Sequence, residues 1–329
     1  MGQRIVPGSS EPHVPVLLDE VLNALQPLHG ASIIDGTFGA GGYSRALLQA
    51  GANVIALDRD PNVAPYVQQL RDDFPNQFKF VATTFSKLDE AIEGRSIDGV
   101  VLDIGVSSMQ LDEPERGFSF MREGPLDMRM AGDGETAADL VNTLEESALA
   151  NLLFAYGEER KSRRIAHTIV AARAEAPIGT TTELARLIEK AIGRKPGDAH
   201  PATRSFQALR IAVNAEFDEL VEGLFAAERV LGEGGRLAVV TFHSLEDRIV
   251  KRFFDPDKGG PAQSRHLPQM EAEVRRWTPV AKAVKPGSSE VSRNPRARSA
   301  ILRGAVRSGA AARPVTFEGL AVPTIRGAA

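Results

Sequence analysis

The sequence predicts an α/β fold, in which a doubly wound and mostly parallel sheet is interrupted by an inserted helical domain. Three observations lead to this prediction. Apolar runs of Val, Ile and Leu recur through the first hundred residues without alternation, as in parallel strands covered on both faces. The spacing of these runs leaves room for helices between them. Strand-like runs then cease between about 112 and 213 and return only later.

The first elements form a βαβαβ pattern. Residues 31–35 (ASIID) predict a strand ended by Gly36, and residues 43–50 predict a helix ended by Gly51. Further strands are predicted at 53–58, 78–83 and 97–103, each rich in β-branched or large apolar residues.

The remaining elements divide the chain. Three possible capping boxes mark helix starts within the insertion, at Thr136-x-x-Asp139, Thr143-x-x-Glu146 and Thr180-x-x-Glu183. A helix over 216–231, a turn at 232–235 and strands at 236–241 and 299–303 follow. We therefore expect a first core part at 1–111, a helical insertion at 112–213, a second core part at 214–305 and a flexible tail at 306–329.

Composition excludes several classes of protein. Hydrophobic residues make up 43% and charged residues 25% of the 329, which is typical of globular proteins. No apolar run approaches the roughly 18 residues of a membrane span, and no signal peptide is evident, so a cytoplasmic protein is expected. The absence of cysteine excludes disulfides and thiolate metal sites, and the five histidines other than His243 lack metal-ligand spacing. We expect no metal.

Charge is distributed unevenly along the chain. From Arg275 to the end, eleven Lys and Arg face only Glu290 and Glu318, so this segment carries +9 and the rest −13. Such a segment suits a polyanionic partner, and it suits a solvated basic tail equally well.

A glycine-rich turn, Asp35–Gly42, joins the first strand to the first helix. Its glycines and the helix N-terminus suit a ligand that approaches the backbone closely, and an acidic residue that can bind ribose follows at Asp58. A nicotinamide dinucleotide and S-adenosylmethionine both fit, as does a turn without a ligand. Ser44 breaks the dinucleotide fingerprint started at Gly39, and Asp35 would repel a pyrophosphate, so both favour the sulfonium donor.

Asp103 ends the fourth strand and should face the same crevice as the turn. Without cysteine, methylation of a pyrimidine C5 through a thiolate adduct is excluded, and direct transfer to nitrogen or oxygen remains. A carboxylate that accepts the N–H of an aromatic amine restores its nucleophilicity, which makes Asp103 the candidate catalytic residue. The plainer interpretation is a helix-capping or turn aspartate.

Two further places are candidates for substrate binding. Phe242 and His243 follow the strand at 236–241 and can stack on a base. The plainer interpretation is a helix start capped by Ser244, in Ser244-x-x-Asp247, with a histidine beside it. Arg296 and Arg298 flank Ala297 after a proline turn and suit phosphate contacts. The charged run at 158–164 is usually only a solvated helix face.

Long motifs in this sequence resemble those of the bacterial small-subunit ribosomal RNA cytosine-N4 methyltransferases. The resemblance runs from about His13 to Arg303. The motifs, in order, are DGTFGAGGYSRALL, LDIGVSSMQLDEPERGFSFMREGPLDMRM, YGEERKSRRIAHTIV, HPATRSFQALRIAVNAE, TFHSLEDRIVKRFF and NPRARSAILR.

The resemblance implies a Rossmann-like S-adenosylmethionine-dependent methyltransferase sheet with a helical substrate-recognition insertion. It implies methyl transfer to the N4 of a decoding-centre cytidine in 16S ribosomal RNA, with the small subunit as partner. The expected donor-binding residues are Gly39, Gly41, Gly42, Tyr43, Asp58, Phe85, Asp103 and Gln110. Tyr43 departs from the family, which commonly has histidine there. The Pro-Pro-aromatic motif of many DNA amino-methyltransferases is also absent, so other residues, Phe242 or Phe118 among them, must hold the base.

Three functions remain open at the level of the sequence: an RNA methyltransferase, a small-molecule methyltransferase with the same core, and a ribosome-assembly factor that binds RNA and donor without turnover. The helical insertion and the basic segment argue against the second, and intact Asp58 and Asp103 argue against the third. The oligomeric state is not fixed by these features.

Overall fold

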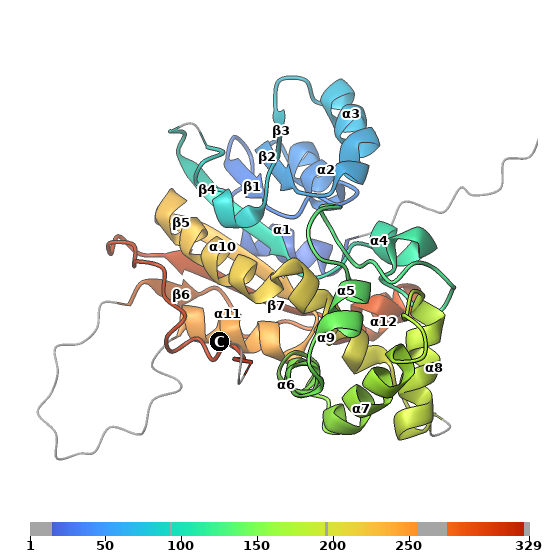
Figure 1. The fold of residues 1–329 in the computed structure, drawn as a ribbon. Coiled ribbons are helices and arrows are strands. Elements are labelled where there is room, and N and C mark those ends of the chain that lie inside the picture. The colour runs from blue at the N-terminus through green and yellow to red at the C-terminus, as the bar shows by residue number, and fades with distance from the viewer. Residues whose placement is uncertain (1–14, 93, 195–196, 256–274, 326–329) are drawn as a thin grey trace, which may run out of the picture.

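The computed structural model describes residues 15–92, 94–194, 197–255 and 275–325 (Figure 1). His13 and Arg326 lie outside these ranges. Seven strands form one sheet in the order β3-β2-β1-β4-β5-β7-β6. The strands are β1 (Ser32–Asp35), β2 (Asn53–Asp58), β3 (Phe78–Ala82), β4 (Ile97–Asp103), β5 (Leu231–Thr241), β6 (Trp277–Pro279) and β7 (Ile301–Arg307).

The sheet has the predicted doubly wound α/β topology. β1 lies between β2 and β4 and is parallel to both, whereas β7 is antiparallel to β5 and β6. The strand order reverses at β1, so a crevice is expected beyond the carboxyl ends of β1 and β4. The strands predicted at 53–58 and 97–103 coincide with β2 and β4.

Helices cover both faces of the sheet (Figure 1). The longer helices that pack on the sheet are α1 (Leu18–Ala24), α2 (Gly42–Gln49), α3 (Ala64–Asp73), α10 (Glu216–Val230) and α11 (Ser244–Phe254). The helical segment between β4 and α10 contains α4 (Ser108–Asp112), α5 (Ala137–Thr143), α6 (Glu146–Gly157), α7 (Ser162–Arg173), α8 (Thr181–Ile192) and α9 (Thr203–Asn214). A short α12 (Ser288–Arg293) precedes β7.

The two faces of the sheet pack into different hydrophobic clusters. Ile34 and Val100 face one cluster together with α10 and α11. Their neighbours Ile33 and Val101 face the other, together with α1, α2 and α3. Consecutive residues point to opposite faces of a strand, so each must be apolar when both faces are covered. This explains the unbroken apolar runs in the sequence.

The segment between β4 and β5 has a third cluster of its own, to which α5 to α9 contribute. Thr136 forms the predicted capping box with Asp139. The oxygen of Thr180 also accepts the N–H of Glu183, as predicted for a helix start. The box predicted from Thr143 is wrong, because its hydroxyl donates to the carbonyl oxygen of Asp139 at 2.8 Å. The domain boundaries themselves stay a prediction.

Three details differ from the sequence expectations. β5 begins at Leu231, so the turn expected at 232–235 lies within the strand, where the pairing with β4 shifts register. β6, whose Trp277 is 1% exposed, was not expected. The segment expected to be a flexible tail contacts the rest of the protein at some positions: Leu320 is buried, and Arg313 forms a 2.6 Å ion pair with Glu228, whereas most of 311–319 is exposed. Among the described helices, none is both long and apolar enough to cross a membrane.

Candidate functional site

A cavity of about 1010 Å³ lies beyond the carboxyl ends of β1, β2, β4 and β5, where the strand order reverses. We call it the donor pocket. Residues of α9 and of the 294–299 segment also line it. It brings together nearly all the predicted site residues, namely Gly39, Gly41, Gly42, Tyr43, Asp58, Phe85, Asp103, Gln110, Phe242, His243 and Arg296. Arg298 does not line it.

The glycine turn must be built from glycine at two positions. Gly41 precedes α2 with φ of 78°, and a Cβ there would lie 2.6 Å from Leu70. A Cβ on Gly42 would overlap the ring of Pro15. The turn therefore leaves a cradle of backbone beside the first N–H groups of α2, which have no acceptor within the helix.

Asp35 lies beneath the turn rather than in the pocket. It is 1% exposed, and its carboxylate accepts the Ser44 hydroxyl at 2.7 Å and the N–H of Thr37 at 3.3 Å. Burial raises the pKa of Asp35 to about 6, against the lowering effect of the Ser44 hydrogen bond. The serine that breaks the dinucleotide fingerprint thus binds the buried aspartate, and Asp35 acts on a ligand only through the field in the pocket.

The Tyr43 side chain is engaged within the protein. Its hydroxyl donates to the carbonyl oxygen of Val16, which closes the segment before α1 over the turn. Burial, followed by the charge of Asp103, raises the pKa of Tyr43. A ligand contact from Tyr43 would therefore use its backbone N–H. Tyrosine and histidine have the same backbone N–H, so this contact would not depend on which of the two residues is present.

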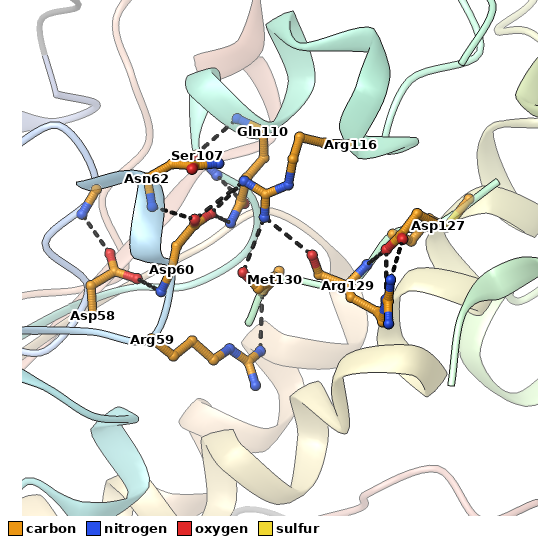
Figure 2. A network of polar contacts seen from close by, with 12 residues as sticks. Asp58, Arg59, Asp60, Asn62, Ser107, Gln110, Arg116, Asp127, Arg129 and Met130 are labelled. Atoms are coloured by element: carbon orange, nitrogen blue, oxygen red, sulfur yellow. Dashed lines mark hydrogen bonds and ion pairs between the residues drawn. The ribbon is translucent and has the colours of Figure 1, made fainter. Parts of the chain in front are cut away.

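Asp58 is fixed by two backbone donors (Figure 2). The N–H of Gly39 donates to one carboxylate oxygen and the N–H of Asp60 to the other, both at 2.8 Å. Burial raises the pKa of Asp58, and these hydrogen bonds oppose the rise. These two backbone contacts hold the Asp58 carboxylate at the pocket wall, next to the glycine-rich turn.

A buried network that the sequence did not indicate lies beside Asp58 (Figure 2). Asp60 accepts the Gln110 amide at 2.8 Å and pairs with Arg116 at 2.9 Å. Arg116 also donates to the carbonyl oxygens of Arg129 and Met130. The Gln110 side chain, which in addition accepts the N–H of Ser107 at 3.0 Å, is thus used within the protein. The sequence could have pointed to both residues, because Asp60 follows Asp58 by two positions and Arg116 lies in one of the motifs given above.

Asp103 carries a carboxylate oxygen without a partner. Its backbone N–H donates to the Thr37 hydroxyl at 2.7 Å. Its Oδ1 is buried and has no hydrogen-bond partner within the part of the chain that is described. Burial, and then the charges of Asp35 and Glu246, raise the pKa of Asp103 to about 8. An unsatisfied buried acceptor in a ligand-sized pocket indicates a place for a donor group from a ligand.

His243 forms the cap of α11, with its Nδ1 accepting the N–H of Glu246 at 3.4 Å. The expected cap at Ser244 is wrong by one residue. The His243 Nε2 lies 2.8 Å from Glu246, whose carboxylate also accepts the Phe242 N–H at 2.9 Å. Glu246, which the sequence interpretation missed, therefore holds both candidate stacking residues at the pocket.

Glu216, His243 and Glu246 each have a side-chain atom that could bind a metal ion, and these three atoms lie within 4.8 Å of one another. Arg210 donates to both oxygens of Glu216, at 2.7 and 2.8 Å. The Arg210 guanidinium therefore supplies the positive charge that a metal ion would otherwise bring to these carboxylates. The group is therefore a buried ion-pair network at the wall of the pocket.

The aromatic residues of the site divide by burial. The half-buried Phe85 ring lies against Gly223 of α10, where a Cβ would overlap it. Phe242 is half-buried beside Gly105. Phe118 is 6% exposed, with the Arg116 guanidinium 5.7 Å above its ring. Phe242 therefore has more ring surface free for a base than Phe118.

Several arginines of the basic segment are paired within the protein. Arg296 forms a 2.5 Å ion pair with Asp112, and Arg303 forms one with Asp247 at 2.7 Å. Arg298 is exposed outside the pocket. Only Arg296 of the two lines the pocket, a phosphate contact by either arginine stays a prediction, and the charge of +9 is partly neutralised by the body of the molecule.

Comparisons with known proteins agree over nearly the whole chain. A family model described as the MraW methylase family matches residues 10–308. A protein of Cereibacter sphaeroides (strain KD131 / KCTC 12085), named "Ribosomal RNA small subunit methyltransferase H", is 57% identical over 318 residues, which are 95% of this chain and 96% of that protein. A protein of the same name from Azorhizobium caulinodans is 56% identical over 312 residues, covering 93% and 90% of the two chains. The solved structure of an rRNA methylase from Streptococcus thermophilus covers 88% of this chain and 95% of its own, with 11% identity and a TM-score of 0.40. The fold assignment accordingly rests on the sheet order given above.

Proposed function

This chain belongs to the MraW methylase family, and on that premise we propose that it transfers a methyl group from S-adenosylmethionine to the exocyclic N4 of a decoding-centre cytidine in 16S ribosomal RNA. Relatives covering nine-tenths or more of the chain are named as small-subunit ribosomal RNA methyltransferases, which supports the RNA substrate. The observation that carries the choice of an amine is the buried Oδ1 of Asp103 in the donor pocket, which has no hydrogen-bond partner among the described residues.

The pocket fits the donor. The backbone cradle at Gly41 and Gly42 and the first N–H groups of α2 would hold its methionine part, and Asp58 would accept its ribose hydroxyls. Bound there, S-adenosylmethionine supplies an electrophilic methyl group on a cationic sulfur. The Asp58 carboxylate lines the cavity and Asp35 lies beneath it, so the local field favours a cationic ligand, and such a ligand would in turn favour ionisation of Asp103.

Asp103 would act on the acceptor. A cytosine N4 lone pair is delocalised into the ring, and an N–H bond donated to Oδ1 localises it on the nitrogen. When nitrogen gains the methyl group it must lose a proton, and Oδ1 is the acceptor for that proton. A group whose pKa is about 8 is well matched to proton transfer near neutral pH.

Phe242 and His243 would bind the target base, with Glu246 holding both in place. The substrate would be rRNA within the small subunit or its precursor, which places the reaction in the cytoplasm.

Labelled methyl transfer to small subunits from cells that lack the protein tests the proposal. We expect label in 16S rRNA and N4-methylcytidine after nucleoside digestion. Label in another nucleoside would refute the amine assignment, and donor binding without any label would support a non-catalytic assembly factor instead.

A further inference from the structure

A second concave surface, here called the basic groove, lies where α6, α7, α9 and α11 meet the segment near residue 321. Figure 1 shows this corner, with α6, α7 and α9 grouped next to α11. Its volume is about 1330 Å³. Six basic residues line it, and they are Arg160, Lys161, Arg163, Arg164, Arg204 and Arg248. Only Glu158 opposes them among its lining residues.

Glu158 offsets only one of these six positive charges. One of its carboxylate oxygens accepts the Ser244 hydroxyl at 2.7 Å, and the other lies 3.6 Å from Arg248. Arg163 and Arg164 are exposed on the first turn of α7 and form no ion pair within the described ranges. Clustered positive charge at a helix N-terminus also opposes the helix dipole, an arrangement that stability alone does not favour. The groove thus holds uncompensated positive charge.

The groove contains an aromatic ring as well as cations. Phe154 of α6 is 60% exposed and lines the groove among the arginines. Arginines bind phosphates through several donors at once, and exposed rings stack on unpaired bases. This combination fits single-stranded nucleic acid better than it fits an acidic protein segment, which has no flat bases to stack.

The basic groove adjoins the donor pocket through two shared helices. On α9, Arg204 lines the groove and Arg210 lines the pocket, about 9 Å apart along the helix axis. Leu245 and Arg248 of α11 line the groove, while the preceding Phe242 and His243 line the pocket. One RNA strand that crosses these helix ends would occupy both.

We propose that the basic groove binds the phosphate backbone of the rRNA strand next to the nucleotide whose base enters the donor pocket. This inference rests on the proposed function. It gives the charged run at 158–164 a role in substrate binding, and it gives the helical segment a direct contact with RNA.

The test compares an Arg163→Gln/Arg164→Gln variant with the wild type, using small subunits from cells that lack the protein. We expect the dissociation constant for subunits to rise about tenfold, and the slope of log affinity against log salt to fall by about 1.4 for two lost phosphate contacts. The KM for subunits should rise, while kcat at saturation and the dissociation constant for S-adenosylmethionine stay unchanged. Phe154→Ala should weaken binding without changing the salt slope.

An Arg71→Gln/Arg186→Gln variant is the matched control. It removes the same charge from exposed positions on α3 and α8 that line neither cavity, so its affinity and slope should equal those of the wild type. Wild-type affinity and slope in the groove variant would overturn the inference. Weaker binding with an unchanged slope would also overturn it, in favour of a protein contact. A wild type that binds subunits but transfers no methyl group would instead refute the proposed function.

Discussion

At the scale of single residues, Asp103 shows how a buried carboxyl is prepared for a proton. Its Oδ1 has no partner within the described ranges, and burial together with Asp35 and Glu246 raises its pKa to about 8. Such an environment disfavours the charged form until a cation or a hydrogen-bond donor enters. Burying this carboxyl therefore lowers the folding stability of the protein, as is common where a group must react.

Replacing Asp103 with Asn should lower methyl transfer about 10²- to 10⁴-fold while donor binding persists, because Asn cannot take the amine proton. In the wild type, kcat/KM should rise as pH increases toward about 8, since the carboxylate is the active form, and the variant should lack this rise. A raised pKa also means that stability is lost as pH rises from about 4 through about 8. The melting temperature of the variant relative to the wild type should therefore increase over that range, as calorimetry can measure.

Asp58→Ala should weaken donor binding by about 1–3 kcal/mol, the usual loss when a polar partner is left unpaired. Titration calorimetry with S-adenosylmethionine measures it. Asp98→Ala is the control, because Asp98 also accepts a backbone N–H, that of Ser32 at 2.8 Å, but lies outside the pocket. Equal donor affinity in both variants would contradict the ribose role.

At the scale of elements, the Asp60–Arg116 pair joins the end of β2 to the loop that follows α4 (Figure 2). The side chains are 2% and 15% exposed, so removing one partner leaves a buried charge without its counterion. Asp60→Ala should lower the free energy of unfolding by about 3–5 kcal/mol.

A double-mutant cycle of Asp60 and Arg116, measured by denaturant unfolding, should give a strong coupling energy. The exposed pair Asp89–Arg229, 2.7 Å apart with side chains 29% and 36% exposed, serves as the comparison and should couple by less than about 1 kcal/mol. Similar coupling in the two cycles would show that burial does not strengthen the first pair.

Elements that depend on local pattern were predictable, and those that depend on distant contacts were not. β2 and β4 follow from their apolar runs, whose residues alternate between two buried faces. The strand of Trp277 is three residues long and gains its place from β7 and from a 2.8 Å hydrogen bond to Glu228, which no local signal reveals. The capping role of His243 was missed because serine is the commoner cap.

The site, too, was predictable where it depends on local sequence and not where it depends on distant contacts. Asp58 and Asp103 end predicted strands, so the edge they share followed from topology. Arg296 pairs with Asp112, which lies 184 positions away in the sequence. Nothing local to Arg296 predicts this partner. Long-range ion pairs of this kind need coordinates.

At the scale of the whole molecule, Glu228 ties the C-terminal segment to the sheet. It is 1% exposed and accepts hydrogen bonds from Arg313 and Trp277. Burial alone would raise its pKa, but the Arg313 hydrogen bonds outweigh burial and hold the pKa of Glu228 below its usual value. A lowered pKa contributes stability that is present above about pH 4.5 and is lost as pH falls.

Glu228→Gln should therefore reduce the melting temperature at pH 7 and reduce it less at pH 3, where the wild-type carboxylate is also being protonated. Thermal scans across pH 3–8 measure the difference. Glu222→Gln, the same change at an exposed position of α10, should not reproduce this pH dependence if the Arg313 contact is its source. A pH-independent difference for Glu228→Gln would contradict the ionic origin.

Because β4 and β5 are neighbours in the sheet but are separated by the whole helical segment, the two walls of the pocket are made at different times. The wall that carries Asp58 and Asp103 is translated first, and Phe242 and His243 leave the ribosome on the order of ten seconds later. Throughout that interval the edge of β4 that faces β5 has no partner strand, whereas the helical segment has a hydrophobic cluster of its own around which it can fold. The proposed donor-binding wall is therefore translated before the proposed base-binding wall, and in the nascent chain the pocket stays open on one side until the strands and the 294–299 segment that follow have emerged.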